Sequence, residues 1–387
     1  MFRPPMLIAV FLLVTGFVPA CMAQLGKNVM IPAGSETDRQ LTAINAATDP
    51  AQKLQLIDQF SQAHPDGDLQ IVADEQYVSY YINAKQYDKA FEYGDKLLAL
   101  DPDNYSNAVN MVRAANEKGD TEKLYAYGEK AAGILERFRA MNAPEGTPAD
   151  NWARMKAEKL ESIKDNEDYI EQSLIRTAYG VKDPNKKADY LQRFAKMYPD
   201  TPQGEQALTV AASAYQQAQN RAKMQEVANS ILAKDPNNVG VLLLLADDYS
   251  ERADQLDKAE AYAKKASSVV DTAKKPENLT DDQWKQQTSI QKGLALSALG
   301  QINIEKKQNA VAVDNFIKAA PLLKSNALLY ARNQYRLGYA YLNLKKNPEA
   351  KQAFTEAASL DTPFKAPAQQ KLSELGAAKP VPHKKAS

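Results

Sequence analysis

Cysteine, histidine and tryptophan are scarce in this chain, whose 387 residues include one cysteine, two histidines and two tryptophans. Cys21 is the only cysteine, so no disulfide can form within the chain. It lies in the apolar N-terminal segment. A cysteine nucleophile or a cysteine-based zinc site is excluded in practice. The sequence also contains no P-loop, no G-x-G-x-x-G and no G-x-S-x-G motif. We therefore predict a protein that is not an enzyme and holds no metal or cofactor, with a site of paired carboxylates as the one catalytic alternative.

An excess of charge of either sign is also missing, because 48 lysines and arginines balance 48 aspartates and glutamates. A chain without net charge has no general attraction for nucleic acid or for anionic lipid. We therefore predict that the partners are proteins or peptides, and that the chain contacts a membrane only through a possible lipid anchor.

Residues 1–23 look like a secretory signal. Arg3 supplies a short positive region, and the apolar run from Met6 to Val18 is too short to be a membrane-spanning helix of the mature protein. Small residues follow, so signal peptidase could cut after Ala20 or after Ala23. We predict an exported protein of the periplasm or cell envelope, with a flexible tether over residues 24–40.

A second form of processing is also open. The sequence Val18-Pro19-Ala20-Cys21 is similar to a bacterial lipobox, in which Cys21 would become the lipidated N-terminal residue. Pro19 departs from the small or aliphatic residue usual at that position. The mature protein is thus predicted to be either free or anchored to a membrane by lipid.

The chain repeats itself at an offset of 132 to 135 residues. TDPAQKLQLIDQFSQAHPD at 48–66 corresponds to KDPNKKADYLQRFAKMYPD at 182–200, and LALDPDN at 98–104 corresponds to LAKDPNN at 232–238. PEGTPADNW at 144–152 matches PENLTDDQW at 276–284, so Trp152 and Trp284 are equivalent. We predict a tandem duplication, with a first half at 41–180 and a second at 181–315. A C-terminal repeat and cap helix at 316–376 and a disordered tail at 377–387 follow.

A shorter repeat of about 34 residues is clearest near the C-terminus. Small residues alternate there with aromatic ones in a pattern that keeps them on one helical face. The pattern consists of Leu337, Gly338, Tyr341, Ala350, Phe354 and Ala357. These residues fill every signature position of the tetratricopeptide repeat, which segment 331–362 therefore resembles.

The resemblance covers most of 41–376 and implies an all-α fold, an α-solenoid of antiparallel helix pairs. Less complete repeats occur at 71–104, 105–135, 205–238, 239–272 and 293–326. Divergent pairs at 41–66 and 169–200 bring the expected number to seven or eight. Ala366–Leu375 is predicted to form a cap helix that Gly376 stops.

The two tryptophan segments interrupt the repeats, and each is predicted to start a helix. Thr147 and Pro148 are typical of an N-cap and first position, and Thr280 with Gln283 is typical of a capping box. Each tryptophan then lies in the first turns of its helix. The favoured interpretation is packing against a neighbouring repeat, and the alternative is an aromatic contact for a ligand.

In tetratricopeptide proteins the first helix of each pair lines a concave groove, and the resemblance places specific residues there. The implied groove residues are Arg332, Tyr335, Tyr339, Leu342 and Asn343; Ser106, Val109, Arg113, Asn116 and Glu117; Glu75, Ser79 and Asn83; and Asp247, Ser250 and Glu251. The Lys/Asn/Arg clamp that some family members use for C-terminal carboxylates is not present. Arg332 with Tyr335 and Tyr339 is the cluster most typical of a binding surface, because arginine and aromatic side chains dominate interface energetics.

The resemblance implies a non-catalytic scaffold of the bacterial cell envelope that binds partner proteins or peptides in its groove. Two alternatives stay open. The first is a structural protein whose repeats assemble with copies of themselves. The second is a repeat domain that captures a cell-wall glycan or lipid through Trp152 and Trp284. The sequence leaves the identity of the partner and the oligomeric state undetermined.

Overall fold

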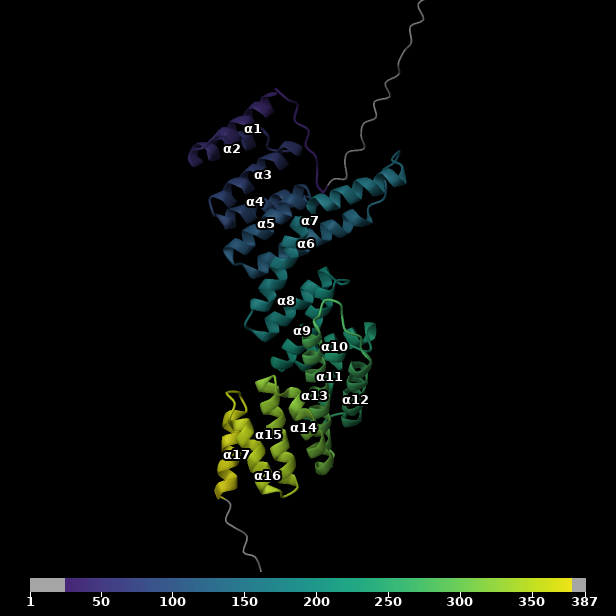
Figure 1. Ribbon diagram of the computed structural model, residues 1–387. Helices are drawn as coiled ribbons and strands as arrows, with labels where there is room; N and C mark the ends of the chain where they lie inside the picture. Colours follow the sequence, from purple (N-terminus) through teal and green to yellow (C-terminus); the bar gives the residue numbers. More distant parts are fainter. Residues whose placement is uncertain (1–24, 378–387) are drawn as a thin grey trace, which may run out of the picture. The chain divides into compact units, whose positions relative to one another are not determined.

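The computed structural model describes residues 25–377, and this part of the chain consists of helices joined by turns and loops, with no β-strand (Figure 1). The predicted all-α fold is confirmed. The cleavage positions Ala20 and Ala23, the lipidation candidate Cys21 and the tail from residue 378 onward lie outside the described residues.

The helices fall into two compact units. The first unit is Met1–Val181 with Lys196–Pro199, and the second is Lys182–Ala195 with Asp200–Ser387. The first contains α1 (Glu36–Ala46), α2 (Pro50–Ala63), α3 (Asp68–Asn83), α4 (Tyr87–Leu100), α5 (Tyr105–Lys118), α6 (Thr121–Ala140) and α7 (Ala149–Gly180). The second contains most of α8 (Pro184–Met197), then α9 (Pro202–Gln217), α10 (Arg221–Lys234), α11 (Val239–Glu251), α12 (Leu256–Thr272), α13 (Asp281–Glu305), α14 (Asn309–Leu323), α15 (Ala327–Asn343), α16 (Asn347–Ala358) and α17 (Lys365–Ala377).

Consecutive helices pack in pairs within each unit. In the first unit α3 packs against α4 and α5 against α6, while α9/α10, α11/α12, α13/α14 and α15/α16 are the pairs of the second. Neighbouring pairs also contact each other, as α14 does α15, and α17 covers α16 at the C-terminal end. Each unit is therefore a stack of antiparallel helix pairs, the α-solenoid architecture of tetratricopeptide repeats.

Helix boundaries recur at the offset seen in the sequence. The helices α2 to α5 and α8 to α11 begin at positions that differ by 134 residues, for example Pro50 and Pro184. The two longest helices of the described chain, α7 and α13, begin at Ala149 and Asp281 and carry Trp152 and Trp284 in their first turns.

Close approach between the helices of a pair depends on glycine opposite a large side chain. A Cβ atom built on Gly338 would lie 2.6 Å from Cε1 of Phe354, and one on Gly300 would lie 2.6 Å from Cε1 of Phe316. Both phenylalanines are completely buried. The small and large positions of the repeat pattern thus form one contact, in which the ring occupies the space that the glycine leaves.

Three predicted helix ends can be compared with the structure. The capping box of Thr280 and Gln283 at the start of α13 is present, with both reciprocal hydrogen bonds. The prediction for α7 was wrong, because Pro148 takes the N-cap position while the Thr147 N–H donates to the Pro144 carbonyl within a turn. Gly376 does not end α17, because it lacks the positive φ of a C-terminal cap, and the helix continues to Ala377.

The segment that precedes α1 differs from the flexible tether expected over 24–40. The Leu25 carbonyl accepts a hydrogen bond of 3.1 Å from the Tyr105 N–H, and its side chain packs against Phe138 and Trp152. The Lys27 N–H donates to Asp101 at 2.8 Å. The segment is thus attached to the first unit, and α1 begins at Glu36.

The turn inside a helix pair repeatedly uses a residue in the left-handed conformation. Gly119 takes this position between α5 and α6, while Lys85, Gln219, Lys307 and Lys345 take it in four other pairs, with φ between 55° and 61°. In each of these turns the N–H of the next residue bonds the carbonyl five positions earlier, as Lys346 does with Tyr341 at 2.9 Å. The bond closes the helix but requires a backbone conformation that residues with a Cβ adopt at a cost.

Replacing Lys345 with glycine is therefore expected to raise the free energy of unfolding by about 0.5–1 kcal/mol, because the strain at φ 61° disappears. The reciprocal control is Gly119→Ala, which introduces a Cβ at φ 73° and should destabilise the protein by about 1 kcal/mol. Denaturant titration of both variants checks the pair. A loss of stability in Lys345→Gly would contradict the strain argument.

Candidate functional site

One face of α15 carries four of the predicted groove residues. Arg332, Tyr335, Arg336, Tyr339 and Asn343 are three or four positions apart, so their side chains share that face. Arg336 was not among the predicted residues, although its position one turn after Arg332 could have indicated it. The described structure thus adds a second arginine to the predicted arginine–tyrosine cluster.

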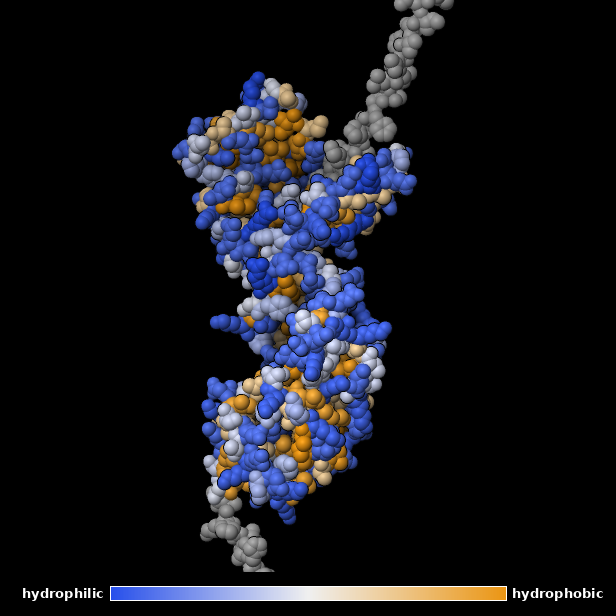
Figure 2. Space-filling view, viewed as in Figure 1, coloured by the Kyte–Doolittle hydropathy of each residue, from blue (hydrophilic) through white to orange (hydrophobic). Residues whose placement is uncertain are grey.

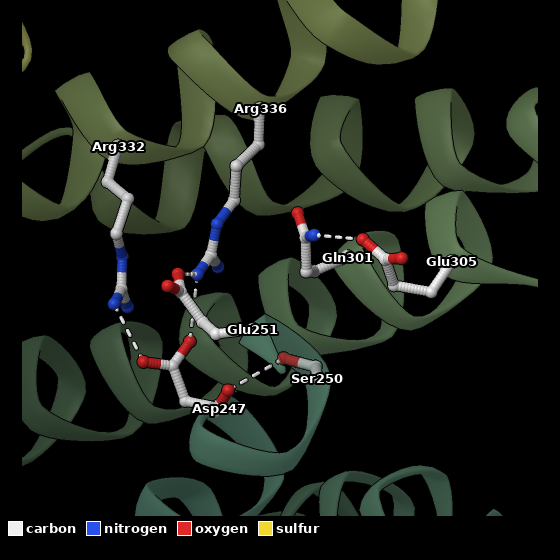
Figure 3. Close-up of polar contacts among 7 residues, drawn as sticks. All are labelled: Asp247, Ser250, Glu251, Gln301, Glu305, Arg332 and Arg336. Carbon is white, nitrogen blue, oxygen red and sulfur yellow. Dashed lines mark hydrogen bonds and ion pairs between the residues drawn. The ribbon is translucent and has the colours of Figure 1, made fainter. Parts of the chain in front are cut away.

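Two of the predicted groove residues from separate repeats bind one another. Arg332 on α15 donates from Nη1 to Asp247 Oδ2 on α11 at 2.8 Å. Arg336 donates from Nη2 to Asp247 Oδ1 at 3.1 Å and also to Glu251, one turn further along α11. Figure 3 shows both arginines extending from α15 toward these carboxylates. We call these four residues, Asp247, Glu251, Arg332 and Arg336, the ion-pair cluster.

The ion-pair cluster joins helices that are not consecutive first helices, because α13 comes between α11 and α15 in the order of the pairs. The part of α13 near this level is rich in small residues, among them the buried Ser297 and Gly300. Figure 3 shows Gln301 and Glu305 of α13 joined by a hydrogen bond, and both line the same cavity as Arg336. Side chains from three successive helix pairs therefore meet on one surface.

Burial and neighbouring charges shift the pKa values of the ion-pair cluster in opposite directions. Burial alone would raise the pKa of Asp247, but the positive charges of Arg332 and Arg336 outweigh it and hold the pKa below the ordinary value. Burial likewise opposes the charged form of Arg336, but Asp247 and Glu251 raise its pKa. The arginine is only 6% exposed, and its Nη1 makes no hydrogen bond within the described residues. Arg336 therefore points into the protein, where its ion pairs with Asp247 and Glu251 stabilise the fold.

Aromatic side chains form the other wall of the site. The Tyr335 and Tyr339 hydroxyls are 3.2 Å apart, and the two rings meet edge to face with centroids separated by 5.1 Å. Both rings pack against the buried Phe354, and Phe364, which precedes α17, lies 5.7 Å from Tyr335. Burial raises the pKa of Tyr335, so this phenol stays neutral at physiological pH.

The two walls enclose a groove of about 370 Å³, which we call the C-terminal groove. Its lining combines aromatic, amide and charged side chains from α11, α13, α15 and the segment before α17. The lining residues are Glu251, Gln301, Ile304, Glu305, Tyr335, Arg336, Tyr339, Asn343 and Phe364. Four of the predicted residues therefore lie together at this cavity, namely Glu251, Tyr335, Tyr339 and Asn343.

Sequence reasoning also missed Gln301, Glu305 and Phe364. The repeat at 293–326 could have indicated Gln301 and Glu305, because they hold the positions that Tyr339 and Asn343 hold in the repeat at 331–362. Phe364 reaches the groove only because α17 folds back onto α16. A repeat alignment does not reveal the place of Phe364.

The predicted groove residues of the first unit have a different environment. Arg113 donates from Nη2 to Asn166 Oδ1 of α7 at 2.8 Å, and Asn116 donates to the Tyr169 hydroxyl at 3.1 Å. Glu117 accepts a hydrogen bond from the Tyr87 hydroxyl at 2.8 Å. These side chains are thus engaged within the unit.

Among the other predicted positions of the first unit, Ser79 and Asn83 on α3 and Ser106 on α5 are exposed. Glu75 accepts a hydrogen bond of 3.2 Å from the Asn104 side-chain amide, and Val109 is buried. The predicted positions of the first unit are thus divided among bonded, buried and exposed side chains.

The two tryptophans differ in exposure. Trp152 is 6% exposed, packs against Phe138 and Leu160, and donates its indole N–H to the Met141 carbonyl at 3.1 Å. Trp284 is half-buried in the first turn of α13. Trp152 therefore serves packing, as the favoured interpretation of its segment had it, and is not available as a contact for a glycan.

Other surface features of the second unit lie outside the groove. Val311 and Ile317 on α14 and Leu328 on α15 are each about half exposed. Figure 2 shows apolar residues in orange among hydrophilic ones in the region of α13 and α14. Among the described residues, no helix is long and apolar enough to cross a membrane, and no cluster of acidic, histidine or cysteine side chains is arranged to hold a metal ion.

Comparison with known proteins gives likeness of architecture only. No family model matches the chain, and no curated protein matches it. Among solved structures it is similar to yeast Tom70, with 14% identity over 90% of this chain and 66% of Tom70 at a TM-score of 0.34. The apo form of RapI shares 14% identity, covering 70% of this chain and 71% of RapI at a TM-score of 0.34. The apo quorum sensor NprR from B. thuringiensis shares 14%, covering 88% and 78% at a TM-score of 0.30. Similarity at this level transfers no ligand or partner to the chain.

Proposed function

We propose that the protein is a non-catalytic scaffold of the bacterial cell envelope and that its C-terminal groove binds an extended segment of a partner protein. The observation that carries the proposal is the groove itself. A cavity of about 370 Å³ lined by three aromatic rings and several polar side chains is typical of a site that accepts a few side chains of a peptide. The envelope location rests on the signal-like residues 1–23.

The ion-pair cluster supports this assignment because it fixes the wall of the groove before any partner arrives. Arg332 and Arg336 hold α15 against Asp247 of α11, so Tyr335 and Tyr339 are presented from a helix that is already in place. A preorganised surface loses less conformational entropy on binding and therefore retains more of its contact energy. The two arginines act as supports, while the tyrosines and amides are the groups that would touch a ligand.

Site-specific photocrosslinking in the cell tests the proposal. A photoreactive phenylalanine analogue replaces Asn343, which is exposed at the groove, or Lys351, which is exposed on α16 outside it. We expect discrete adducts with envelope proteins from position 343 and none of them from position 351. The additional substitution Gln301→Trp, which fills the groove without removing a wall, should abolish the adducts.

Three results would contradict the proposal. Identical adducts from positions 343 and 351 would show that the groove has no special role. Adducts formed only with a second copy of the chain would instead support the self-assembling structural protein, and cytoplasmic partners would exclude the envelope location.

A further inference from the structure

The C-terminal groove presents negative charge although two arginines lie next to it. Arg336 is 6% exposed and is bound by Asp247 and Glu251, and Arg332 is bound by Asp247. The side chain of Glu251, in contrast, is 53% exposed. Glu305 accepts one hydrogen bond of 2.9 Å, from the Gln301 side-chain amide, and makes no ion pair with any described residue. The charges accessible from the cavity are therefore carboxylates.

Glu305 is placed to accept more than its present bond. A carboxylate has two oxygens with roughly four lone-pair directions, of which the Gln301 amide uses one. The same hydrogen bond fixes the orientation of the carboxylate within the groove. A positively charged donor that entered the cavity would find an oriented carboxylate that makes no ion pair with a described residue.

The aromatic wall of the groove also favours a positively charged ligand. Tyrosine and phenylalanine rings attract a cation to their faces through the ring quadrupole. The chain itself gives an example at this position, because Lys371 Nζ of α17 lies 5.5 Å from the centroid of Tyr339. That lysine is neutralised by Glu374, at 2.7 Å, and does not line the cavity. A tyrosine of the groove therefore already receives an ammonium group in the folded protein.

We infer that the C-terminal groove selects a lysine or arginine side chain of the bound segment, seated between Glu305 and the faces of Tyr335 and Tyr339. The inference rests on the proposed function and specifies its ligand. A segment ending in a free carboxylate is disfavoured, because Arg332 and Arg336 are engaged with Asp247 and Glu251, and Lys371 is engaged with Glu374. Charge complementarity thus favours a basic segment of a partner protein.

Binding of short synthetic peptides tests the inference. The probes are nine-residue glycine–serine peptides, blocked at both ends, that carry at their centre two lysines, two arginines, two methionines or two glutamates. Fluorescence anisotropy is read at low and at 0.5 M salt. We expect the lysine and arginine peptides to bind at least about tenfold more tightly than the methionine and glutamate peptides, with the preference reduced at high salt.

Matched variants locate the effect. Glu305→Gln should weaken binding of the basic peptides about fivefold to tenfold, because it removes the unpaired carboxylate while keeping its shape. Glu277→Gln removes the same charge from an exposed position outside the groove and should leave binding unchanged. Circular dichroism melting of Glu305→Gln distinguishes lost binding from lost folding. Equal affinity of Glu305→Gln and the wild type would overturn the inference.

Three further outcomes are informative. If crosslinking from position 343 captures a partner but the basic peptides show no preference, the inference fails while the proposed function stands. If crosslinking captures nothing, the proposed function itself fails. If the preference appears only after Lys379, Lys384 and Lys385 are replaced with glutamine, the occupant is the chain's own tail and not a partner.

Discussion

Replacing Asp247 with alanine is expected to lower the free energy of unfolding of the second unit by about 3 kcal/mol. The substitution leaves Arg332 without its ion-pair partner and Arg336 with only Glu251. Arg336 is buried, so its uncompensated charge cannot be hydrated without opening the structure. Breaking a buried pair typically costs about 3–5 kcal/mol, and the 21% exposure of the Arg332 side chain places the expected loss at the lower end.

The measurement is denaturant unfolding followed by the fluorescence of Trp284, in a Trp152→Phe background so that the signal comes from α13. The control is Asp257→Asn, because this carboxylate also binds a lysine but its side chain is 98% exposed, and no measurable change is expected. The triple variant Asp247→Leu, Arg332→Met, Arg336→Met should recover most of the loss, since no charge remains buried. Equal stability of Asp247→Ala and wild type would show that the cluster does not hold α11 to α15.

The loss of stability in Asp247→Ala should also depend on pH in a defined direction. The pKa of Asp247 is lowered in the folded state, so its stabilising contribution is present above the ordinary pKa of 3.8 and is lost as pH falls through the lowered value. The difference in stability between wild type and Asp247→Ala should therefore be constant near neutral pH and shrink in acid below about pH 4.

Replacing Gly338 with alanine is expected to destabilise the second unit by about 2 kcal/mol. The new Cβ would lie 2.6–2.8 Å from three atoms of the Phe354 ring, which is completely buried and cannot move aside freely. Gly376→Ala is the matched control. It is also a helical glycine, no atom lies within 4 Å of its added Cβ, and a gain of about 0.5–1 kcal/mol is expected from helix propensity.

A double variant separates steric overlap from other causes. Phe354→Leu shortens the ring side chain, so Gly338→Ala should be less harmful in that background than in the wild type, and the two effects should not add. Thermal or denaturant unfolding of the four proteins measures the coupling. Additive losses would indicate that the glycine is not needed for the approach of α15 and α16.

Local features of the fold could be predicted from the sequence because they depend on contacts within one repeat. The pattern of Gly338, Tyr341 and Phe354 predicts the pair α15/α16, because a small and a large residue meet inside that pair. The capping box at Thr280 is likewise a contact over three residues. These relations are set by helical periodicity, which can be recognised in a single sequence.

Relations across several repeats could not be predicted. Asp247 and Arg332 were each assigned to the groove, but their mutual bond depends on how far the stack curves between α11 and α15. Arg113 occupies the equivalent position to Asp247 at the 134-residue offset, yet it contacts α7 instead. The partner that each groove side chain contacts is thus determined by the arrangement of three helix pairs together.

The ion pairs between α11 and α15 have a consequence for how the second unit comes apart. In most solenoids the stability is close to a sum over neighbouring repeats, so the terminal repeat can unravel by itself. Here the loss of α15 would leave Asp247 of α11, two pairs away, without its ion-pair partners. It would therefore weaken a part of the stack that does not neighbour α15 in the sequence. The last three pairs should therefore unfold as one cooperative block, with no stable stage in which only the C-terminal pair is frayed.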